Sequence, residues 1–136
     1  MTSKLTVFVF FIAVCFSNTA FAEIDPAAPS ASHKLETAAD AMHGYLHHHY
    51  DSGYGSHQLE EAATEMHHAL HEWQHGELSE SDIDAMADDL RTVWNEFRQT
   101  IIPAGLLSAG DMELEALYAD IKTSYKNLRF LLKKAK

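Results

Sequence analysis

"SHQLEEAATEMHHALH", residues 56–71, carries the pattern on which the fold depends. Its apolar residues recur at spacings of three and four, so that they share one face of an α-helix. An earlier segment, "SHKLETAADAMHGYLH" at residues 32–47, has the same residue at ten of its sixteen positions. The two segments begin 24 residues apart, which suits one helix and one turn. This internal repeat predicts two consecutive helices with matching apolar faces.

Four amphipathic helices are predicted along the chain. The apolar spacing extends the two repeated segments to about 32–50 and 56–75, and it recurs at about 80–102 and 109–134. No segment shows the period-two alternation of a half-buried strand. Four helices of this length joined by short turns favour an all-α, up-down-up-down four-helix bundle.

Residues that favour helix ends lie at the predicted boundaries. The turn "DSGYGS" at 51–56 offers Ser56 as the N-cap of the second helix. Ser79 and Asp82 have the spacing of a capping box at the start of the third helix, and Pro103 follows its end. These signals indicate separate helices rather than one continuous helix.

The first 22 residues have the composition of a signal peptide. A lysine precedes the apolar run "LTVFVFFIAVCF", and "SNTAFA" ends in the A-x-A pattern of a cleavage site. The run is too short to span a membrane, and no later segment is apolar enough to do so. We therefore predict a cleaved signal peptide at 1–22, a flexible leader with two prolines at 23–31, a bundle at 32–136 and a periplasmic location.

Composition and charge restrict the classes of function. The single cysteine, Cys15, leaves with the signal peptide, which excludes disulfides and thiolate chemistry in the processed chain. The net charge of −10 becomes one unit more negative when Lys4 is removed. Such a charge argues against binding to nucleic acid or to anionic membranes, and it favours a cationic ligand. No nucleophile-and-base combination and no glycine-rich phosphate loop is present, so the chain is not expected to be an enzyme.

The ten histidines are confined to the first two predicted helices and the residues that follow them, between His33 and His75. On a helical wheel that starts at the first leucine of each repeat, the later two histidines of the repeat lie at about 80° and 120°. Each helix therefore presents an H-x-x-x-H pair on the flank of its apolar face. The recurring positions are His33 with His57, His43 with His67, and His47 with His71.

Paired imidazoles at this spacing are suited to binding a transition metal. Residues four apart on a helix have Cβ atoms about 5–6 Å apart, so two rings can converge on one ion. Neutral imidazole binds copper, nickel, zinc and cobalt, and copper has the highest affinity in the divalent series. The expected cofactor is a divalent transition metal ion, copper in the first place. The predicted ligands are His43, His47, His67 and His71, assisted by His75, His33 and His57.

A third or fourth ligand is expected from the neighbouring helix. If a tight turn joins the first two helices, opposed residues have numbers that add to about 107. This register places His67 beside Asp40, His47 beside Glu60, His71 beside Glu36, and His75 near His33. The two histidine flanks converge in one bundle handedness and diverge in its mirror image, and the sequence leaves both open.

Other residues on these helices are expected in the core. His49 lies inside the apolar stripe, which predicts a hydrogen-bonded core histidine. Met42 and Met66 occupy stripe positions as well, so packing is preferred to thioether ligation of Cu(I). The same spacing places three aromatic residues in the core, namely Trp73, Trp94 and Phe97.

The first two helices, and above all "GSHQLEEAATEMHHALHEWQHGE" at 55–77, resemble the small histidine-rich metal-binding bundle proteins of the bacterial periplasm. Members of that family lack cysteine, consist of repeated helices with histidines at helical spacing, and bind divalent ions, copper among them. The resemblance implies metal binding or buffering by the first hairpin. It does not extend to the second half of the chain, which has no histidine after residue 75 and a more aromatic core.

Other cofactor classes fit the sequence less well. The Glu-x-x-His spacing of di-iron bundles occurs at Glu65/His68 and Glu72/His75, but both pairs lie on one helix. Hemerythrin-like bundles need histidines from all four helices, and covalent haem needs a C-x-x-C-H motif. A b-type haem bundle and a pH-responsive, partner-binding bundle stay open as alternatives. The sequence identifies no protein partner.

Overall fold

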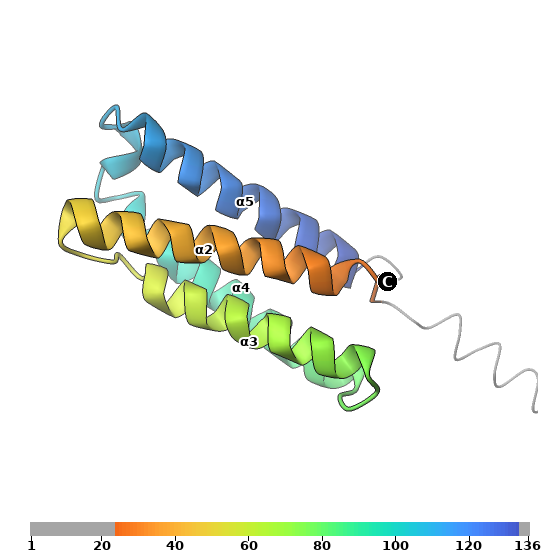
Figure 1. The fold of residues 1–136 in the computed structure, drawn as a ribbon. Coiled ribbons are helices and arrows are strands. Elements are labelled where there is room, and N and C mark those ends of the chain that lie inside the picture. The colour runs from red at the N-terminus through yellow and green to blue at the C-terminus, as the bar shows by residue number, and fades with distance from the viewer. Residues whose placement is uncertain (1–23, 134–136) are drawn as a thin grey trace, which may run out of the picture.

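The structure, a computed structural model, describes residues 24–133. Four long helices form the up-down-up-down bundle predicted from the sequence, and the described residues contain no strand (Figure 1). The signal peptide expected at 1–22 lies outside the described residues. The helices are α2 (Ala28–Tyr50), α3 (Ser56–Gln74), α4 (Glu80–Ile101) and α5 (Met112–Leu132), with the 3₁₀ turn η1 (Leu106–Ser108) before α5.

Helix α2 lies between α3 and α5 in the bundle. It packs against both α3 and α5, and α3 packs in turn against α4 (Figure 1). Large rings fill the fourth side, between α4 and α5. Trp94 stacks on Tyr125 and Tyr118, with ring centroids 5.2 and 5.9 Å apart. The bundle is therefore closed by aliphatic contacts around α2 and by aromatic contacts opposite it.

The core consists of the apolar stripes predicted from the sequence. Met42 and Met66 have no exposed surface, which confirms that both pack inside the bundle. Trp94 and Phe97 are buried, and Trp73 is half-buried against the core. The fully buried apolar residues of the two repeated segments occupy equivalent positions: Leu35, Ala39, Met42 and Leu46, and Leu59, Ala63, Met66 and Leu70.

Two predicted N-caps have different outcomes. Ser79 and Asp82 form the predicted capping box: Asp82 N–H donates to Ser79 Oγ at 3.2 Å, and Ser79 N–H donates to the Asp82 carboxylate at 3.0 Å. The prediction that Ser56 caps α3 is wrong. Gly55, with φ 87°, occupies the N-cap, and Ser56 is the first, fully buried residue of the helix. Glycine adopts this left-handed conformation without the steric cost of a side chain.

The segment expected as a flexible leader at 23–31 is ordered where the structure describes it. Ile24 is buried, and Asp25 N–H donates to the carbonyl of Leu131 at the end of α5, at 3.1 Å. Helix α2 begins inside this segment, and Pro29 lies in its first turn. Proline is favoured there because its missing N–H has no helical partner in any case. The prolines therefore start a helix rather than maintain a flexible chain.

The loop between α2 and α3 changes the register predicted for the hairpin. His43 Nδ1 lies 3.2 Å from Ser56 Oγ, so α3 starts beside a residue two turns before the end of α2. The loop runs back along α2, and the last turns of α2 extend past the start of α3 (Figure 1). Positive φ values at Asp51, Tyr54 and Gly55, of 57°, 50° and 87°, reverse the chain. The simple turn assumed from the sequence has no such step back.

The projecting end of α2 is attached to α5 instead. Asp111, the N-cap of α5, accepts hydrogen bonds from Leu114 N–H at 3.1 Å and from the hydroxyls of Tyr45 and Tyr50 at 2.8 and 2.5 Å. The Tyr50 hydroxyl, the Leu114 amide and the Tyr45 hydroxyl hold the pKa of Asp111 below its ordinary value. The same carboxylate raises the pKa of Tyr45 to about 12. One side chain thus caps α5 and fixes the end of α2.

We expect Asp111→Ala to lower the free energy of unfolding at neutral pH, because it removes the cap and both tyrosine contacts. A carboxylate whose pKa is lowered on folding stabilises the fold above its unfolded pKa of about 3.9, and this contribution is lost as the pH falls through the folded value. The difference between wild type and variant should therefore stay constant from about pH 7 to pH 5 and shrink below pH 4. Urea unfolding followed by circular dichroism measures it.

Glu113→Ala is the matched control, because Glu113 is an exposed acid in the same first turn. An equal loss of stability in Glu113→Ala and Asp111→Ala would show that the tyrosine contacts contribute nothing beyond the charge at the helix start.

Candidate metal centre

The histidine flanks of α2 and α3 face each other along the line of contact between the two helices, which is here called the groove. Their side chains pair in an antiparallel ladder in which the residue numbers of each pair add to 100, not to the predicted 107. The pairs are His33 with His67, Glu36 with Thr64, Asp40 with Glu60, and His43 with His57. The bundle therefore has the handedness in which the flanks converge, and imidazoles lie at both ends of the ladder with carboxyl groups between them.

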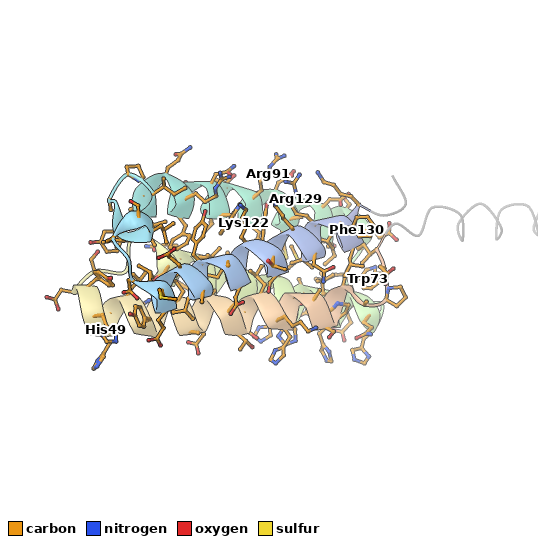
Figure 2. All side chains as sticks on the ribbon, turned by 90° about the horizontal axis from the view of Figure 1, so that it is seen from above. His49, Trp73, Arg91, Lys122, Arg129 and Phe130 are labelled. Carbon is orange, nitrogen blue, oxygen red and sulfur yellow. The ribbon has the colours of Figure 1, made fainter. Side chains whose placement is uncertain are left out.

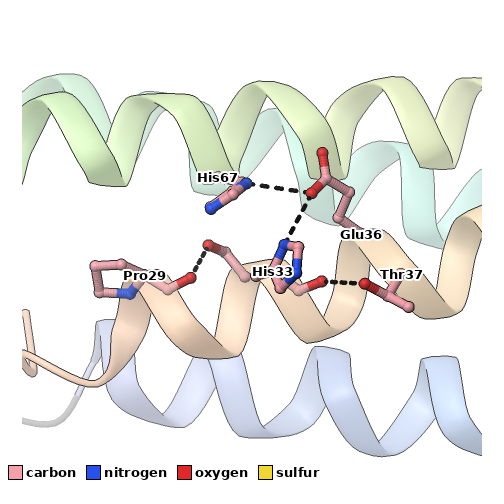
Figure 3. A network of polar contacts seen from close by, with 6 residues as sticks. Pro29, His33, Glu36, Thr37 and His67 are labelled. Carbon is pink, nitrogen blue, oxygen red and sulfur yellow. Dashed lines mark hydrogen bonds and ion pairs between the residues drawn. The ribbon is translucent and has the colours of Figure 1, made fainter.

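Three residues at one end of the groove form a cluster with the geometry of a metal site, here called the Glu36 cluster. Glu36 Oε1 lies 3.2 Å from His33 Nδ1 and 3.2 Å from His67 Nδ1 (Figure 3). One candidate ligand atom from each of the three residues lies within 4.8 Å of the others. Helix α2 supplies His33 and Glu36 one turn apart, and α3 supplies His67. The cluster thus joins the two helices.

The separations within the Glu36 cluster are close to those of a coordination shell. Zinc and similar ions bind imidazole nitrogen and carboxylate oxygen at about 2.0–2.2 Å, so neighbouring ligand atoms of a tetrahedral ion are roughly 3.3 Å apart. The two nitrogen-to-oxygen distances of 3.2 Å agree with this value. The third separation, between the two imidazole nitrogens, lies within 4.8 Å.

The electrostatic state of Glu36 suits a cation. Burial alone raises the pKa of this carboxyl, but hydrogen bonds from Thr64 and His33, together with the charge of His67, outweigh burial and lower the pKa. The Glu36 side chain is consequently an ionised carboxylate at neutral pH. The side chains of Glu36 and His67 are 22% and 30% exposed, whereas that of His33 is 62% exposed, so the cluster is open to solvent on one side.

A carboxyl pair occupies the middle of the groove. A hydrogen bond to Asp40, burial and the negative charge of Asp40 raise the pKa of Glu60 above its ordinary value. Glu60 Oε2 is buried and has no hydrogen-bonding donor among residues 24–133. When Glu60 is protonated, it can donate a hydrogen bond to Asp40. This pair places negative charge between the two groups of imidazoles.

Three histidines gather at the other end of the groove, beside the loop; they are called the loop cluster. The ring of His43 lies 5.1 Å from the ring of His47 on the same helix and 5.1 Å from the ring of His57 on α3. Burial first, and then the charges of His57 and His47, lower the pKa of His43. His43 is therefore neutral over a wider pH range than an exposed histidine.

The remaining predicted ligands do not join the groove clusters. The rings of His71 and His75 contact each other near the end of α3, with centroids 4.6 Å apart, and both residues are exposed. The expected partners of these two histidines, Glu36 and His33, contact His67 instead. The loop that steps back along α2 explains the change, because it displaces every cross-helix pair in the same direction.

His49 is not in the core, contrary to the prediction. It is exposed near the end of α2, where Figure 2 shows it pointing away from the bundle, and its ring lies 4.3 Å from that of Tyr45. The stripe position of His49 is real, but α2 extends past α3 at this point, so α3 does not cover it. Sequence periodicity identifies the face of a helix and not the length over which a neighbour covers that face.

Glu36 is the candidate ligand that the histidine pattern does not identify. Its sequence signal is the H-x-x-E spacing of His33 and Glu36, which puts an imidazole and a carboxylate one turn apart. The register predicted from the sequence places Glu36 beside His71, as a supporting carboxylate. Its central position follows from the register, which brings His67 within 3.2 Å of its carboxylate.

Comparison of the chain with models of protein families, with curated proteins and with solved structures finds no match. Within residues 24–133, none of the helices combines the length and the apolar character needed to cross a lipid bilayer. Figure 2 shows that Arg91, Lys122 and Arg129 lie on α4 and α5, apart from the groove between α2 and α3. The groove between α2 and α3 is therefore the feature of the described residues that indicates a function.

We expect Glu60→Gln to make the metal-free protein slightly more stable at pH 7, by no more than about 1 kcal/mol. A carboxyl whose pKa is raised on folding stabilises the fold below its unfolded pKa, and this contribution is lost as the pH rises through the folded value. At pH 7 the ionised pair therefore repels, whereas a glutamine amide can donate to Asp40. The gain should disappear near pH 4, where wild-type Glu60 is protonated.

Urea unfolding at pH 7 and pH 4 in the presence of a chelator measures this difference. Glu65→Gln, an exposed position on the same helix, is the control for the change in net charge. A Glu60→Gln protein that is less stable than wild type at pH 7 would contradict the proposed repulsion between Asp40 and Glu60.

Proposed function

We propose that this protein binds and buffers a divalent transition metal ion in the groove between α2 and α3, with the Glu36 cluster as the principal site. The observation that carries the proposal is the position of the Glu36 carboxylate, 3.2 Å from one imidazole nitrogen on each helix. Two imidazoles and a carboxylate form a ligand set common to zinc and copper sites. The sequence-based expectation of copper first, then nickel or zinc, is part of this proposal.

The openness of the site supports buffering rather than permanent storage. Three protein ligands leave at least one coordination position of the ion to water, which is the arrangement of exchangeable and catalytic sites and not of closed structural ones. His33, the most exposed ligand, can leave and return without disturbing the core. No reacting group accompanies the ligands in the described cluster, so we propose metal binding without catalysis.

The charge of the chain supports the uptake of cations. A net charge of −10 attracts divalent ions to the surface, and the groove adds the ionised Glu36 and the central carboxyl pair. An exported protein with these properties would take up metal from the periplasm, which is the compartment proposed here from the signal-like N-terminus.

The contacts between histidines favour one alternative, a pH-responsive bundle that binds a protein partner. His33 and His67 have rings 5.0 Å apart on different helices, so protonation of both places like charges across the groove. Such a bundle would bind its partner without metal and switch near pH 6. The b-type haem alternative would require Met42 or Met66 to leave the core, in which both are fully buried.

We expect the double variant His33→Ala/His67→Ala to lose one equivalent of bound Cu(II) or Zn(II) at pH 7. Isothermal titration of the processed chain with each ion measures stoichiometry and affinity. Binding at this site should weaken below about pH 6, because protons compete for the imidazoles. Bound metal should also raise the melting temperature of the wild type, since the ion binds the folded state.

His48→Ala/His68→Ala is the matched control, because it removes two exposed histidines, one from each helix, that lie outside both groove clusters. It should bind metal as the wild type does. If both double variants bind as many ions as the wild type, with equal affinity, the proposed site does not exist.

A further inference from the structure

The loop cluster is a second place where three metal-binding side chains face one space. His43, His47 and His57 line a single hollow on the surface, together with the glycines at both ends of the short loop segment 53–55. Two of the histidines come from α2, and the third comes from the first turn of α3. No carboxylate lines this hollow, so its main donor atoms are imidazole nitrogens, in contrast to the Glu36 cluster. Glu61 Oε1 lies 3.1 Å from Nε2 of His57, which leaves Nδ1 of that ring for an ion.

Two of the three ring separations in the loop cluster match those of imidazoles that share an ion, and the rings of His47 and His57 must rotate toward each other for one ion to bind all three. A metal bound to a ring nitrogen at about 2.0–2.1 Å lies roughly 3.2 Å from the ring centroid, so two rings at a tetrahedral angle have centroids about 5 Å apart. The ring of His43 meets this condition twice, at 5.1 Å from His47 and at 5.1 Å from His57. His43 is therefore the central ligand of the three.

A buried hydroxyl orients the central ring. His43 Nδ1 lies 3.2 Å from the Oγ of Ser56, a residue with no exposed surface. When Nδ1–H donates to this oxygen, the lone pair of Nε2 is free for an ion, and metal-binding histidines commonly have such a partner on the second nitrogen. A Cβ at Gly53 would lie 3.3 Å from Ser56 Oγ and 3.8 Å from His43 Nδ1, so glycine lets the loop approach this pair closely.

The two clusters are too far apart to share an ion. His33 and His43 are ten residues apart on α2, which corresponds to about 15 Å along the helix axis. Binuclear sites have metals roughly 3.5–4 Å apart. The Asp40–Glu60 pair lies between the clusters and lowers the repulsion between two bound cations. Each cluster can thus be occupied while the other is filled.

We propose that His43, His47 and His57 form a second, all-imidazole metal site, so that the hairpin holds two separate ions. This inference extends the proposed function of the groove but rests on different residues. Neutral nitrogen ligands favour Cu(II), Ni(II) and Zn(II), whereas a site that includes a carboxylate also accepts Mn(II). The second site therefore discriminates more strongly against Mn(II) than the Glu36 cluster does.

The test is equilibrium dialysis of the processed chain against Ni(II) or Cu(II), followed by elemental analysis. The wild type and the control His48→Ala/His68→Ala should bind two equivalents. His43→Ala/His57→Ala and His33→Ala/His67→Ala should each bind one. The nitrogen couplings in the electron paramagnetic resonance spectrum of Cu(II) should show more nitrogen ligands in the protein that retains the loop cluster than in the one that retains the Glu36 cluster.

Retention of two equivalents by His43→Ala/His57→Ala would overturn the second site, as would a wild type that binds one ion and loses it only in His33→Ala/His67→Ala. The latter result would leave the proposed function intact. If the wild type binds one ion and only His43→Ala/His57→Ala loses it, the result would refute the Glu36 site and support the loop cluster as the metal site.

The single variant His47→Ala guards against misfolding, because His47 is exposed and does not touch Ser56. Circular dichroism should show wild-type helicity for this variant, and the affinity of one site should fall about tenfold or more. Unchanged affinity at both sites would count against the second site.

Discussion

The antiparallel register of α2 and α3 is the constraint on which the groove depends. It is set by a loop that reverses through left-handed residues, ends in Gly55 and places Ser56 beside His43. From that starting point, every cross-helix pair along the groove follows at helical spacing. The same step back leaves the end of α2 without cover from α3, and Asp111 holds this end against α5. Loop geometry thus determines both the content of the groove and the attachment of the hairpin to the rest of the bundle.

The arrangement of charge along the groove gives its two ends different chemistry. The Glu36 cluster includes an ionised carboxylate and is partly open to solvent, whereas the loop cluster offers three imidazoles and a buried hydroxyl. The Asp40–Glu60 pair separates them, and the pKa of Glu60 is raised there by its hydrogen bond to Asp40, by burial and by the charge of Asp40. The core beneath is made of matching apolar residues from two similar helices. Similar helices therefore present different sites, because antiparallel packing opposes non-equivalent positions of the repeated segments.

The sequence predicts the helices and the core well, because burial of an apolar face at helical spacing determines both. The stripe from Leu35 to Leu46, the burial of Met66 and the capping box at Ser79 are all confirmed. The predicted groove contents are only partly correct. The sequence does not determine whether the histidine flanks converge, and the predicted pairing of His71 with Glu36 is wrong. Both features depend on bundle handedness and on loop dihedral angles. The prediction that His49 lies in the core is wrong for a related reason, because periodicity does not indicate how far a neighbouring helix extends.

The common register of the ladder has a consequence for insertions and deletions. Loss of one residue between Glu36 and Asp40 would turn the earlier part of α2 by about 100° relative to the later part, and so remove His33 from the groove while His43 stays in place. A change in the length of the loop would displace all the pairs together. The buried Ala31 and Leu35 would turn with His33, so a one-residue deletion within the helix would disturb the core as well as one end of the groove, whereas the loop must keep its length for either end to persist.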